Sequence, residues 1–328
     1  MASSKQLSTK YEADCQYLHH FFSGNSGSSN ARRVVEIFTQ RNVEELKLIR
    51  GTYYGLYNHD LLHLLSRMKT TLARVAYLRA CEPSNRDAEL IRNSLFGKNL
   101  DLDVLIEIVC TRSSSELISI KLAYHARYYS DLERDVSSKT NGNIKEILLA
   151  VMNSSKYSGG KVDKSMAMCD SKTLYEAIES GKYIDQRCIT LLLKQRSSDQ
   201  MKAILFSYKQ LYGQEFSKFL KKDKCGEFGR QLRVAIRCIQ FPEKHFAKQL
   251  RKTLKNSDAC EVIIRTIVTR SAVDIKQINE AFTKKTGWTL ETLIRNEFNN
   301  SSSQNDKVLY DLVGDILVAL VKHSRRVH

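Results

Sequence analysis

The chain has 328 residues, of which 42% are hydrophobic, and its 52 lysines and arginines outnumber its 36 acids to give a formal net charge of +16 at pH 7. With only 14 glycines and two prolines, the composition is typical of a helical protein and argues against a β-sandwich or a β-barrel. The basic excess favours polyanionic partners, namely nucleic acid, anionic lipid headgroups or acidic proteins, without distinguishing among them.

The cysteines and the apolar stretches indicate the cellular compartment of the protein. The eight cysteines are scattered, with no CxxC pair, which is typical of reduced thiols in a reducing compartment. The N-terminus, MASSKQLSTKYEAD, has no apolar core of a secretory signal. The longest apolar stretch, near 316–321, is far shorter than the ~20 residues that span a bilayer. We therefore expect a soluble protein of the cytoplasm without a membrane-spanning segment.

After a short N-terminal tail, expected over residues 1–12, one helical pattern recurs four times. An apolar residue stands five positions after each of four arginines, an isoleucine stands eight positions after it, and a tyrosine or phenylalanine stands twelve positions after it. These spacings place all three positions on one stripe of a helix, which predicts a surface that faces the core. The arginines are Arg41, Arg112, Arg196 and Arg270.

Each arginine is expected to end one helix just before the next begins. An N-cap residue follows it directly, and an acid or amide stands three positions later, which is the spacing of a capping box. We expect the arginines to cap helix C-termini and to pair with the helix dipole or with acids of other repeats. The four N-cap pairs are Asn42 with Glu45, Ser113 with Glu116, Ser197 with Gln200 and, as a near relative, Ser271 with Asp274.

The junctions between repeats give the expected domain boundaries. Pro83 and Pro242 each stand just before a fresh helix, where a missing amide does no harm. The junction at 153–170 is longer and rich in glycine and serine, so the chain is expected to divide as two repeats plus two repeats. The expected parts are repeats at 13–82, 83–153, 169–241 and 242–321, a linker at 154–168 and a basic C-terminal tail at 322–328.

The fourfold pattern resembles the annexin repeat, and the segment CTRSSSELISIKLAYHARYYSDLERDV, residues 110–136, resembles plant annexins in particular. The resemblance covers about 13–320. It implies an all-α fold of four repeats, each of about five helices, that together form a curved disc. It also implies binding to anionic phospholipid membranes through Ca²⁺ held in loops on the convex face.

The resemblance implies that Ca²⁺ is held by carbonyls of a glycine loop before each arginine and by an acid after it. Such a site must supply six to eight oxygens. The acid position holds Met68 in the first repeat and Lys139 in the second, and neither side chain ligates Ca²⁺. The third and fourth repeats keep an acid, which is otherwise an ordinary solvated side chain near a helix end. The candidate calcium ligands are Gly181, Tyr183, Asp223, Asn256 and Glu297.

Lysines stand at several of the loop positions that the resemblance turns toward the membrane, and a dense basic run covers 218–255. Each basic residue near an anionic surface contributes on the order of 1 kcal/mol to binding. The hypothesis is salt-sensitive lipid binding that needs little or no Ca²⁺, and the alternative is a solvated basic face without a ligand. The candidate lipid-binding residues are Lys98, Lys139, Lys182, Lys221, Lys222 and Lys255.

Two cysteines, and one position where a histidine would be needed, decide whether a redox or peroxidase activity is expected. Cys110 and Cys238 match positions where the resemblance implies a redox-active pair, and the favoured alternative is two buried structural thiols. A peroxidase activity of plant annexins is attributed to a histidine that is Gln40 here, so that activity does not carry over. No GxxxxGK[ST], GxSxG or HExxH motif is present. We expect a binding protein rather than an enzyme.

Two functions from different classes remain. The first is peripheral binding to anionic phospholipid membranes. The second is a basic all-α scaffold that binds nucleic acid or F-actin. Nucleic acid is the less favoured partner, because single-stranded binding sites interleave aromatic and basic side chains. The basic run has only Phe228, Phe241 and Phe246 among its large rings.

Overall fold

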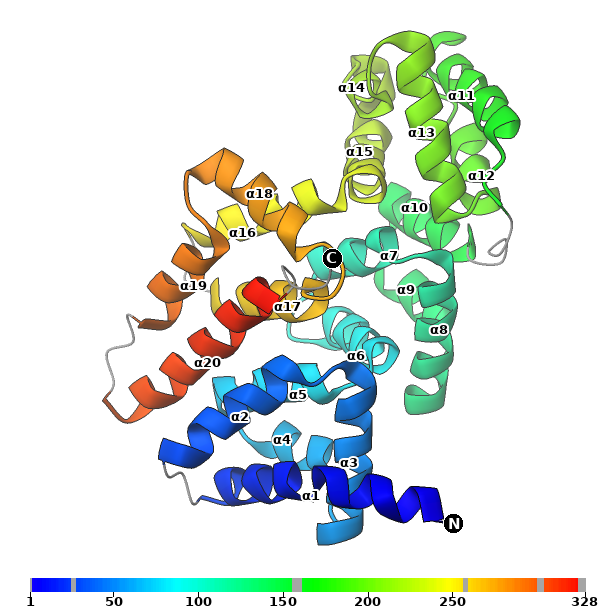
Figure 1. The fold of residues 1–328 in the computed structure, drawn as a ribbon. Coiled ribbons are helices and arrows are strands. Elements are labelled where there is room, and N and C mark those ends of the chain that lie inside the picture. The colour runs from blue at the N-terminus through cyan, green and yellow to red at the C-terminus, as the bar shows by residue number, and fades with distance from the viewer. Residues whose placement is uncertain (1, 25–27, 155–160, 256–258, 300–303, 324–328) are drawn as a thin grey trace. The chain divides into compact units, whose positions relative to one another are not determined.

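The computed structural model describes residues 2–24, 28–154, 161–255, 259–299 and 304–323 (Figure 1). The described residues form twenty α-helices and one 3₁₀ helix, with no strand among them. This confirms the all-α prediction. Among these residues no helix has the length and hydropathy that crossing a membrane requires.

The chain divides into two compact units, and each has its own hydrophobic core. The terminal unit comprises residues 1–83 and 246–328, and the middle unit comprises 84–245. The first and last repeats therefore share one core, and the second and third share the other. This grouping differs from the sequential pairs expected from the junction at 153–170, because buried side chains rather than chain order decide which repeats pack together.

The terminal unit contains the helices of the first and last repeats. Its boundaries with the middle unit fall at the first residue of α6 and inside α16. Its helices are α1 (Ala2–Phe22), α2 (Ser28–Gln40), α3 (Val43–Tyr57), α4 (Leu61–Arg67), α5 (Thr71–Ala80), most of α16 (Pro242–Thr253), α17 (Ala259–Arg270), α18 (Ile275–Thr286), α19 (Leu290–Asn299) and α20 (Gln304–His323).

The middle unit contains the second and third repeats. In each of them two helices flank a loop, a long third helix follows the arginine, and two more helices close the repeat. Its helices are α6 (Pro83–Phe96), α7 (Leu102–Thr111), α8 (Ser114–Tyr128), α9 (Leu132–Lys139), α10 (Gly142–Asn153), α11 (Lys164–Glu179), α12 (Gln186–Gln195), α13 (Ser198–Tyr212), α14 (Phe216–Phe219), the 3₁₀ helix η2 (Asp223–Cys225) and α15 (Gly226–Gln240).

The helices start earlier than the sequence indicated at two places. Residues 2–12, expected as a tail, belong to α1, where Tyr11, Cys15 and Leu18 are buried at helical spacing. Inside the expected linker, α11 begins at Lys164 and buries Ala167. In both places the buried stripe of the helix extends beyond the residues that define the repeat.

The predicted core stripe is confirmed in all four long helices that follow the arginines. In α8, for example, Leu117, Ile120 and Tyr124 are each at most 2% exposed. Burying a side chain of this size stabilises the fold by about 1.5–3 kcal/mol. The equivalent buried residues are Leu46, Ile49 and Tyr53 in α3, Met201, Ile204 and Tyr208 in α13, and Ile275, Ile278 and Phe282 in α18.

The predicted capping boxes form in the first two repeats and not in the other two. Asn42 with Glu45 and Ser113 with Glu116 make both hydrogen bonds of the box. In the third repeat the Ser197 hydroxyl accepts a hydrogen bond from the backbone N–H of Gln200, as a capping box requires. The side chain of Gln200, however, bonds the backbone N–H and the carbonyl of Asp163 instead of the backbone of Ser197.

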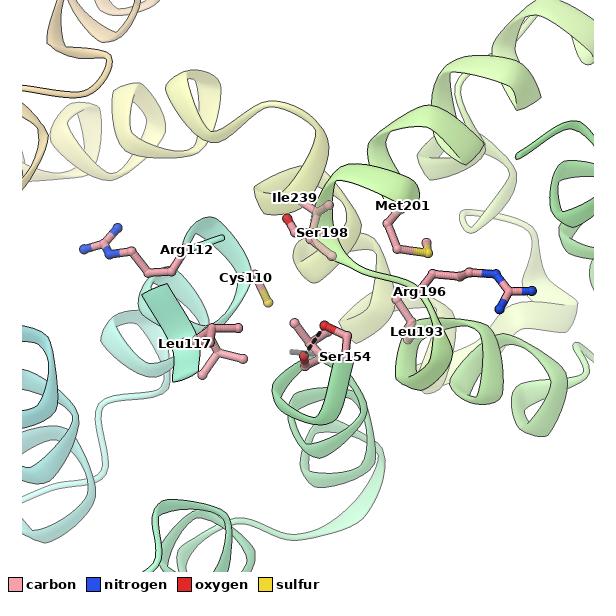
Figure 2. A pocket seen from close by; sticks show the side chains of 11 residues that line it. Cys110, Arg112, Leu117, Ser154, Leu193, Arg196, Ser198, Met201 and Ile239 are labelled. Carbon is pink, nitrogen blue, oxygen red and sulfur yellow. Dashed lines mark hydrogen bonds between the residues drawn. The ribbon is translucent and has the colours of Figure 1, made fainter. Parts of the chain in front are cut away.

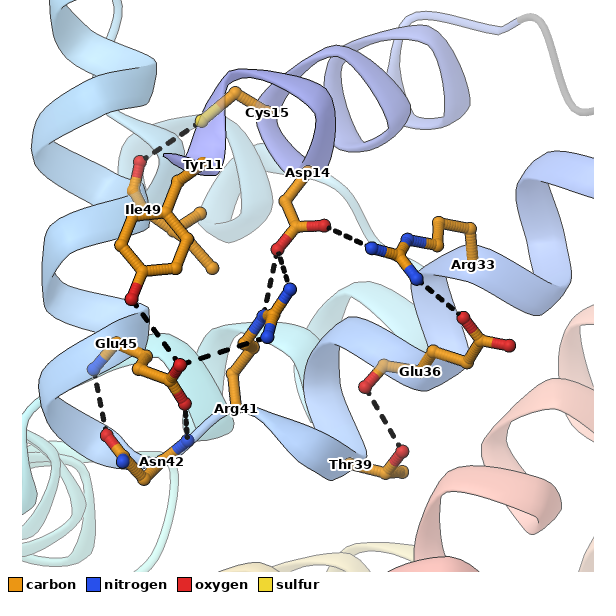
Figure 3. Close-up of polar contacts among 10 residues, drawn as sticks. All are labelled: Tyr11, Asp14, Cys15, Arg33, Glu36, Thr39, Arg41, Asn42, Glu45 and Ile49. Atoms are coloured by element: carbon orange, nitrogen blue, oxygen red, sulfur yellow. Dashed lines mark hydrogen bonds and ion pairs between the residues drawn. The ribbon is translucent and has the colours of Figure 1, made fainter. Parts of the chain in front are cut away.

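Each of the first three arginines forms an ion pair with an aspartate near the start of the same repeat. Arg41 Nε donates to Asp14 Oδ2 over 2.9 Å, in a network that also ties Arg33 and Glu36 (Figure 3). The expected partners were the helix dipole and acids of other repeats. The acid instead belongs to the same repeat as the arginine, because the end of the second helix of the repeat lies against the first helix.

The ion pair of the second repeat is the most deeply buried. Arg112 Nε donates to Asp87 Oδ2 over 2.6 Å, and both side chains are 4% exposed. Burial disfavours the charge on Arg112, yet the attraction of Asp87 outweighs it and raises the pKa of the guanidinium. In the third repeat Arg196 pairs with Asp170 over 2.7 Å.

The fourth repeat replaces this interaction. Counted from the proline that opens the helix, Phe246 occupies the place of Asp87. The Arg270 guanidinium lies 4.8 Å from the Phe246 ring centroid and forms two 2.7 Å hydrogen bonds with Asp274. Asp274 therefore makes no capping hydrogen bond with its side chain, so the predicted box is wrong here.

Removing the carboxylate of Asp87 tests the contribution of the buried pair. Asp87→Asn leaves the Arg112 charge buried without its counter-charge, and breaking a buried pair costs about 3–5 kcal/mol. Urea denaturation should show a loss of that size. Asp199→Asn is the control, since the exposed pair of Asp199 with Lys202 contributes about 1 kcal/mol or less. Equal losses in the two variants would contradict this account.

Candidate functional site

The two loops of the third repeat that were expected to share a calcium ion lie next to each other. The segment with Gly181 and Tyr183 connects α11 to α12, and Asp223 begins η2. The amide of Ile184 donates to the Lys224 carbonyl over 3.3 Å, which joins the two segments. The sequence register therefore identified segments that the fold brings together.

The donors of this loop pair are one carboxylate, that of Asp223, and the backbone carbonyls of the loop. The described residues contain no group of three or more histidine, cysteine, aspartate or glutamate side chains that could hold a metal. The exposed carboxylate of Asp223 stands between Lys222 and Lys224. A Cβ on Gly181 would lie 3.2 Å from the Tyr183 carbonyl oxygen, so a glycine suits this turn. One carboxylate with loop carbonyls is the kind of donor set that the resemblance implies, and waters would complete the six to eight oxygens that Ca²⁺ takes.

Sequence reasoning missed Glu179, which organises the lysines of this site. Its carboxylate pairs with Lys222 and, over 3.5 Å, with Lys224. The hydrogen bond from Lys222 is the main reason that the pKa of Glu179 is lowered. Lys222, predicted as a lipid contact, is thus already paired. A carboxylate at the end of the first helix, in a repeat whose second loop is rich in lysine, is the sequence signal that could have indicated this pair.

A basic hollow lies beside the same loop. It has a volume of about 390 Å³, and its lining includes Lys221, Asp223, Arg230 and Arg233. Arg233 Nε donates to the Ser217 carbonyl over 3.0 Å, which fixes its position. Burial and the nearby Arg237 lower the pKa of Arg233. The hollow therefore concentrates positive charge around a single acid.

In the second repeat the two predicted lysines are exposed near one loop. Gly97 ends the first helix, and a Cβ there would meet the Asn93 carbonyl oxygen at 2.5 Å, which only glycine avoids. Lys98 follows it and is exposed. The Lys139 ammonium lies 4.6 Å from the ring centroid of Phe96, the residue just before Gly97. The lysine at the acid position thus packs beside the glycine loop.

The fourth repeat offers a less favourable carboxylate. Glu297 is partly buried, and burial raises its pKa. Asn256, the predicted partner loop residue, lies outside the described residues, and Lys255 just before it is exposed.

Cys110 and Cys238 are both free and buried. Cys110 lines a cavity of about 10 Å³, room for a single water, together with Leu117, Ser154 and Ile239 (Figure 2). Burial raises the pKa of Cys110 to about 12. The Cys238 Sγ lies 3.0 Å from His245 Nδ1, and its pKa is also raised, chiefly by burial. Protonated buried thiols react slowly, which agrees with structural roles, while a redox role stays a prediction.

Comparison with known proteins places the chain in a class. An annexin family model matches residues 86–151, 170–234 and 245–303. Annexin III, a solved structure 24% identical in sequence, superposes with a TM-score of 0.79 and covers 93% of this chain and 92% of its own. Calcium-bound annexin (Sm)1, 20% identical, gives a TM-score of 0.73 over 92% and 89% of the two chains. The fold is that of four repeats of five helices.

Proteins similar to this chain in sequence show which family it belongs to. Annexin D6 of Arabidopsis thaliana is 34% identical over 319 residues, covering 95% of each chain. Annexin Gh1 of Gossypium hirsutum is 34% identical and covers 92% of this chain and 95% of its own. The protein belongs to the annexin family, whose shared property is calcium-dependent phospholipid binding, and the predicted resemblance is confirmed.

Thiol labelling at pH 8 tests the burial of the cysteine pair. We expect the exposed Cys169 to react rapidly with an aromatic disulfide reagent, and Cys110 and Cys238 to react only after unfolding in urea. Peptide mass mapping at short times identifies the labelled residue, and Cys169→Ser should remove the rapid phase due to that thiol. Rapid labelling of Cys110 in the folded protein would contradict its structural role.

Proposed function

We propose that this annexin binds anionic phospholipid membranes peripherally through basic loops, with a calcium dependence that is weak or lost. The observation that carries the proposal is the replacement of calcium ligands by exposed lysines beside the glycine loops. In the second repeat Lys98 and Lys139 lie by one loop, and in the third Lys182 and Lys221 lie by the other.

The energetics of this substitution are favourable at low salt. A calcium ion bridges a carboxylate-lined loop to a lipid phosphate, whereas an ammonium group attracts the phosphate directly. Each such lysine contributes on the order of 1 kcal/mol near an anionic leaflet, and salt screens the attraction over about 10 Å. Lys222 contributes less than its position suggests, because Glu179 already neutralises it. Four loop lysines of the middle unit remain as principal contacts.

Neutralising those four lysines together tests the proposal. Lys98, Lys139, Lys182 and Lys221 are changed to glutamine, and binding to phosphatidylserine vesicles is measured by co-sedimentation in chelator. We expect the affinity at low salt to fall by between tenfold and about a thousandfold, because four charges that each contribute about 1 kcal/mol are removed. The wild-type protein should also dissociate as the salt concentration rises.

A second set of four exposed lysines provides the matched control, because it removes the same net charge from helix residues that are not among the predicted lipid contacts. This control changes Lys172, Lys194, Lys276 and Lys284 to glutamine. It should retain most of the binding. Absence of wild-type binding in chelator at low salt, or equal losses in the two variants, would refute the proposal. Binding to F-actin or nucleic acid in place of vesicles would favour the alternative basic scaffold.

A substitution of Asp223, the acid of the third repeat, distinguishes attachment through lysines from attachment through Ca²⁺. If lysines dominate, Asp223→Asn should leave vesicle binding in chelator unchanged or stronger, since it removes a negative charge from the basic hollow. Calorimetric titration with Ca²⁺ should give little heat for the wild type and the variant alike. Strong Ca²⁺ binding that Asp223→Asn abolishes would instead establish a working calcium site.

A further inference from the structure

An apolar groove on the middle unit is separate from the basic hollow and from the cysteine cavity. It has a volume of about 770 Å³ and is lined by the start of α11, one face of α13 and the last residues around the end of α15. Volumes of about 300–1,000 Å³ are typical of sites that bind small molecules. The groove is therefore large enough for a ligand of that size.

The groove exposes large apolar side chains to solvent. Phe206 of α13 is 63% exposed, Met168 of α11 is 50% exposed and Leu211 is 44% exposed. Each apolar Å² left in water costs about 25 cal/mol relative to burial, and contiguous exposed patches of this kind commonly mark binding sites. A ligand with an apolar chain would recover part of that cost.

Lysines and one buried amide supply polarity to the same groove. Lys164, Lys202 and Lys209 all contribute to its lining. Lys202 also makes an exposed ion pair with Asp199, and the Asp163 carboxylate caps the Met166 amide. The lining itself contains no acidic side chain, so it carries a positive charge.

Gln240 adds a hydrogen-bonding group to the lining. Its Oε1 atom is buried and has no hydrogen-bond partner among the described residues. A buried acceptor without a partner costs about 1–3 kcal/mol. If the side chain turned toward the groove, its amide N–H would donate to an anionic oxygen of a ligand.

We propose that this groove binds a single-chain anionic amphiphile, with its acyl chain against Phe206, Met168 and Leu211 and its carboxylate or phosphate beside the lysines. The apolar surface and the positive charge match the two ends of such a molecule. An amphipathic helix needs a row of anchor pockets at helical spacing, whereas one continuous hollow suits a single chain. This binding is independent of attachment to a bilayer.

The test is calorimetric titration with monomeric sodium oleate and, separately, with oleoyl lysophosphatidate, both below their micelle concentrations. Phe206→Ser should weaken both at least tenfold. Leu122→Ser is the matched control, because Leu122 occupies the same position of α8, is 67% exposed and does not line the groove. It should bind both ligands like the wild type.

Changing Lys164, Lys202 and Lys209 to glutamine identifies the head group. A greater loss for lysophosphatidate than for oleate indicates a phosphate ligand, and a loss for oleate alone indicates a fatty acid. Oleyl alcohol, which lacks the charge, should bind more weakly than either. The proposal would be overturned if the wild type bound neither amphiphile, or if Phe206→Ser bound them as tightly as the wild type. It would also be overturned if the groove bound an acidic helical peptide and no amphiphile.

Discussion

In the first three repeats, an ion pair between an arginine and an aspartate of the same repeat is the interaction on which the arrangement of the helices depends. It joins the end of the second helix to the start of the first, as Arg112 and Asp87 do inside the middle unit. Taking both charges out of water is costly, so the pair is favourable only when its hydrogen bonds are well made. That requirement fixes the register of the two helices, and the register in turn positions the glycine loop at their opposite ends.

Much of this fold could be predicted because its signals are local. The stripe of Ile120 and Tyr124 and the box of Ser113 with Glu116 lie within one helix and its first turn. One miss involves a partner distant in sequence, and another involves a competition within a single turn. Gln200 leaves its box for the backbone of Asp163. Arg270 faces Phe246 in place of an aspartate and takes Asp274, four residues later, out of its predicted box. The grouping of the repeats likewise depends on which apolar faces meet, which spacing along the chain does not encode.

The candidate site was predictable to the same degree. The repeat register placed Gly181 and Asp223 in segments that the fold joins, but it did not reveal that Glu179 holds the neighbouring lysines. The apolar groove is harder still to predict. Phe206 and Leu122 occupy the same position in their repeats and are similarly exposed, yet only Phe206 lines a groove. What surrounds Phe206 comes from α11 and from the end of α15, which approach it only in three dimensions.

The discontinuous terminal unit has a consequence for synthesis on the ribosome. The middle unit is one continuous stretch, so its core can assemble while the remaining chain is still being translated. The first repeat emerges earliest, but it shares its core with helices encoded last. Until those arrive, α2 and α5 can pack against helices of their own repeat, but the apolar residues that contact α20 and α17 stay uncovered. The oldest part of the nascent chain is thus the last to mature, and it is the part that a chaperone would need to shield.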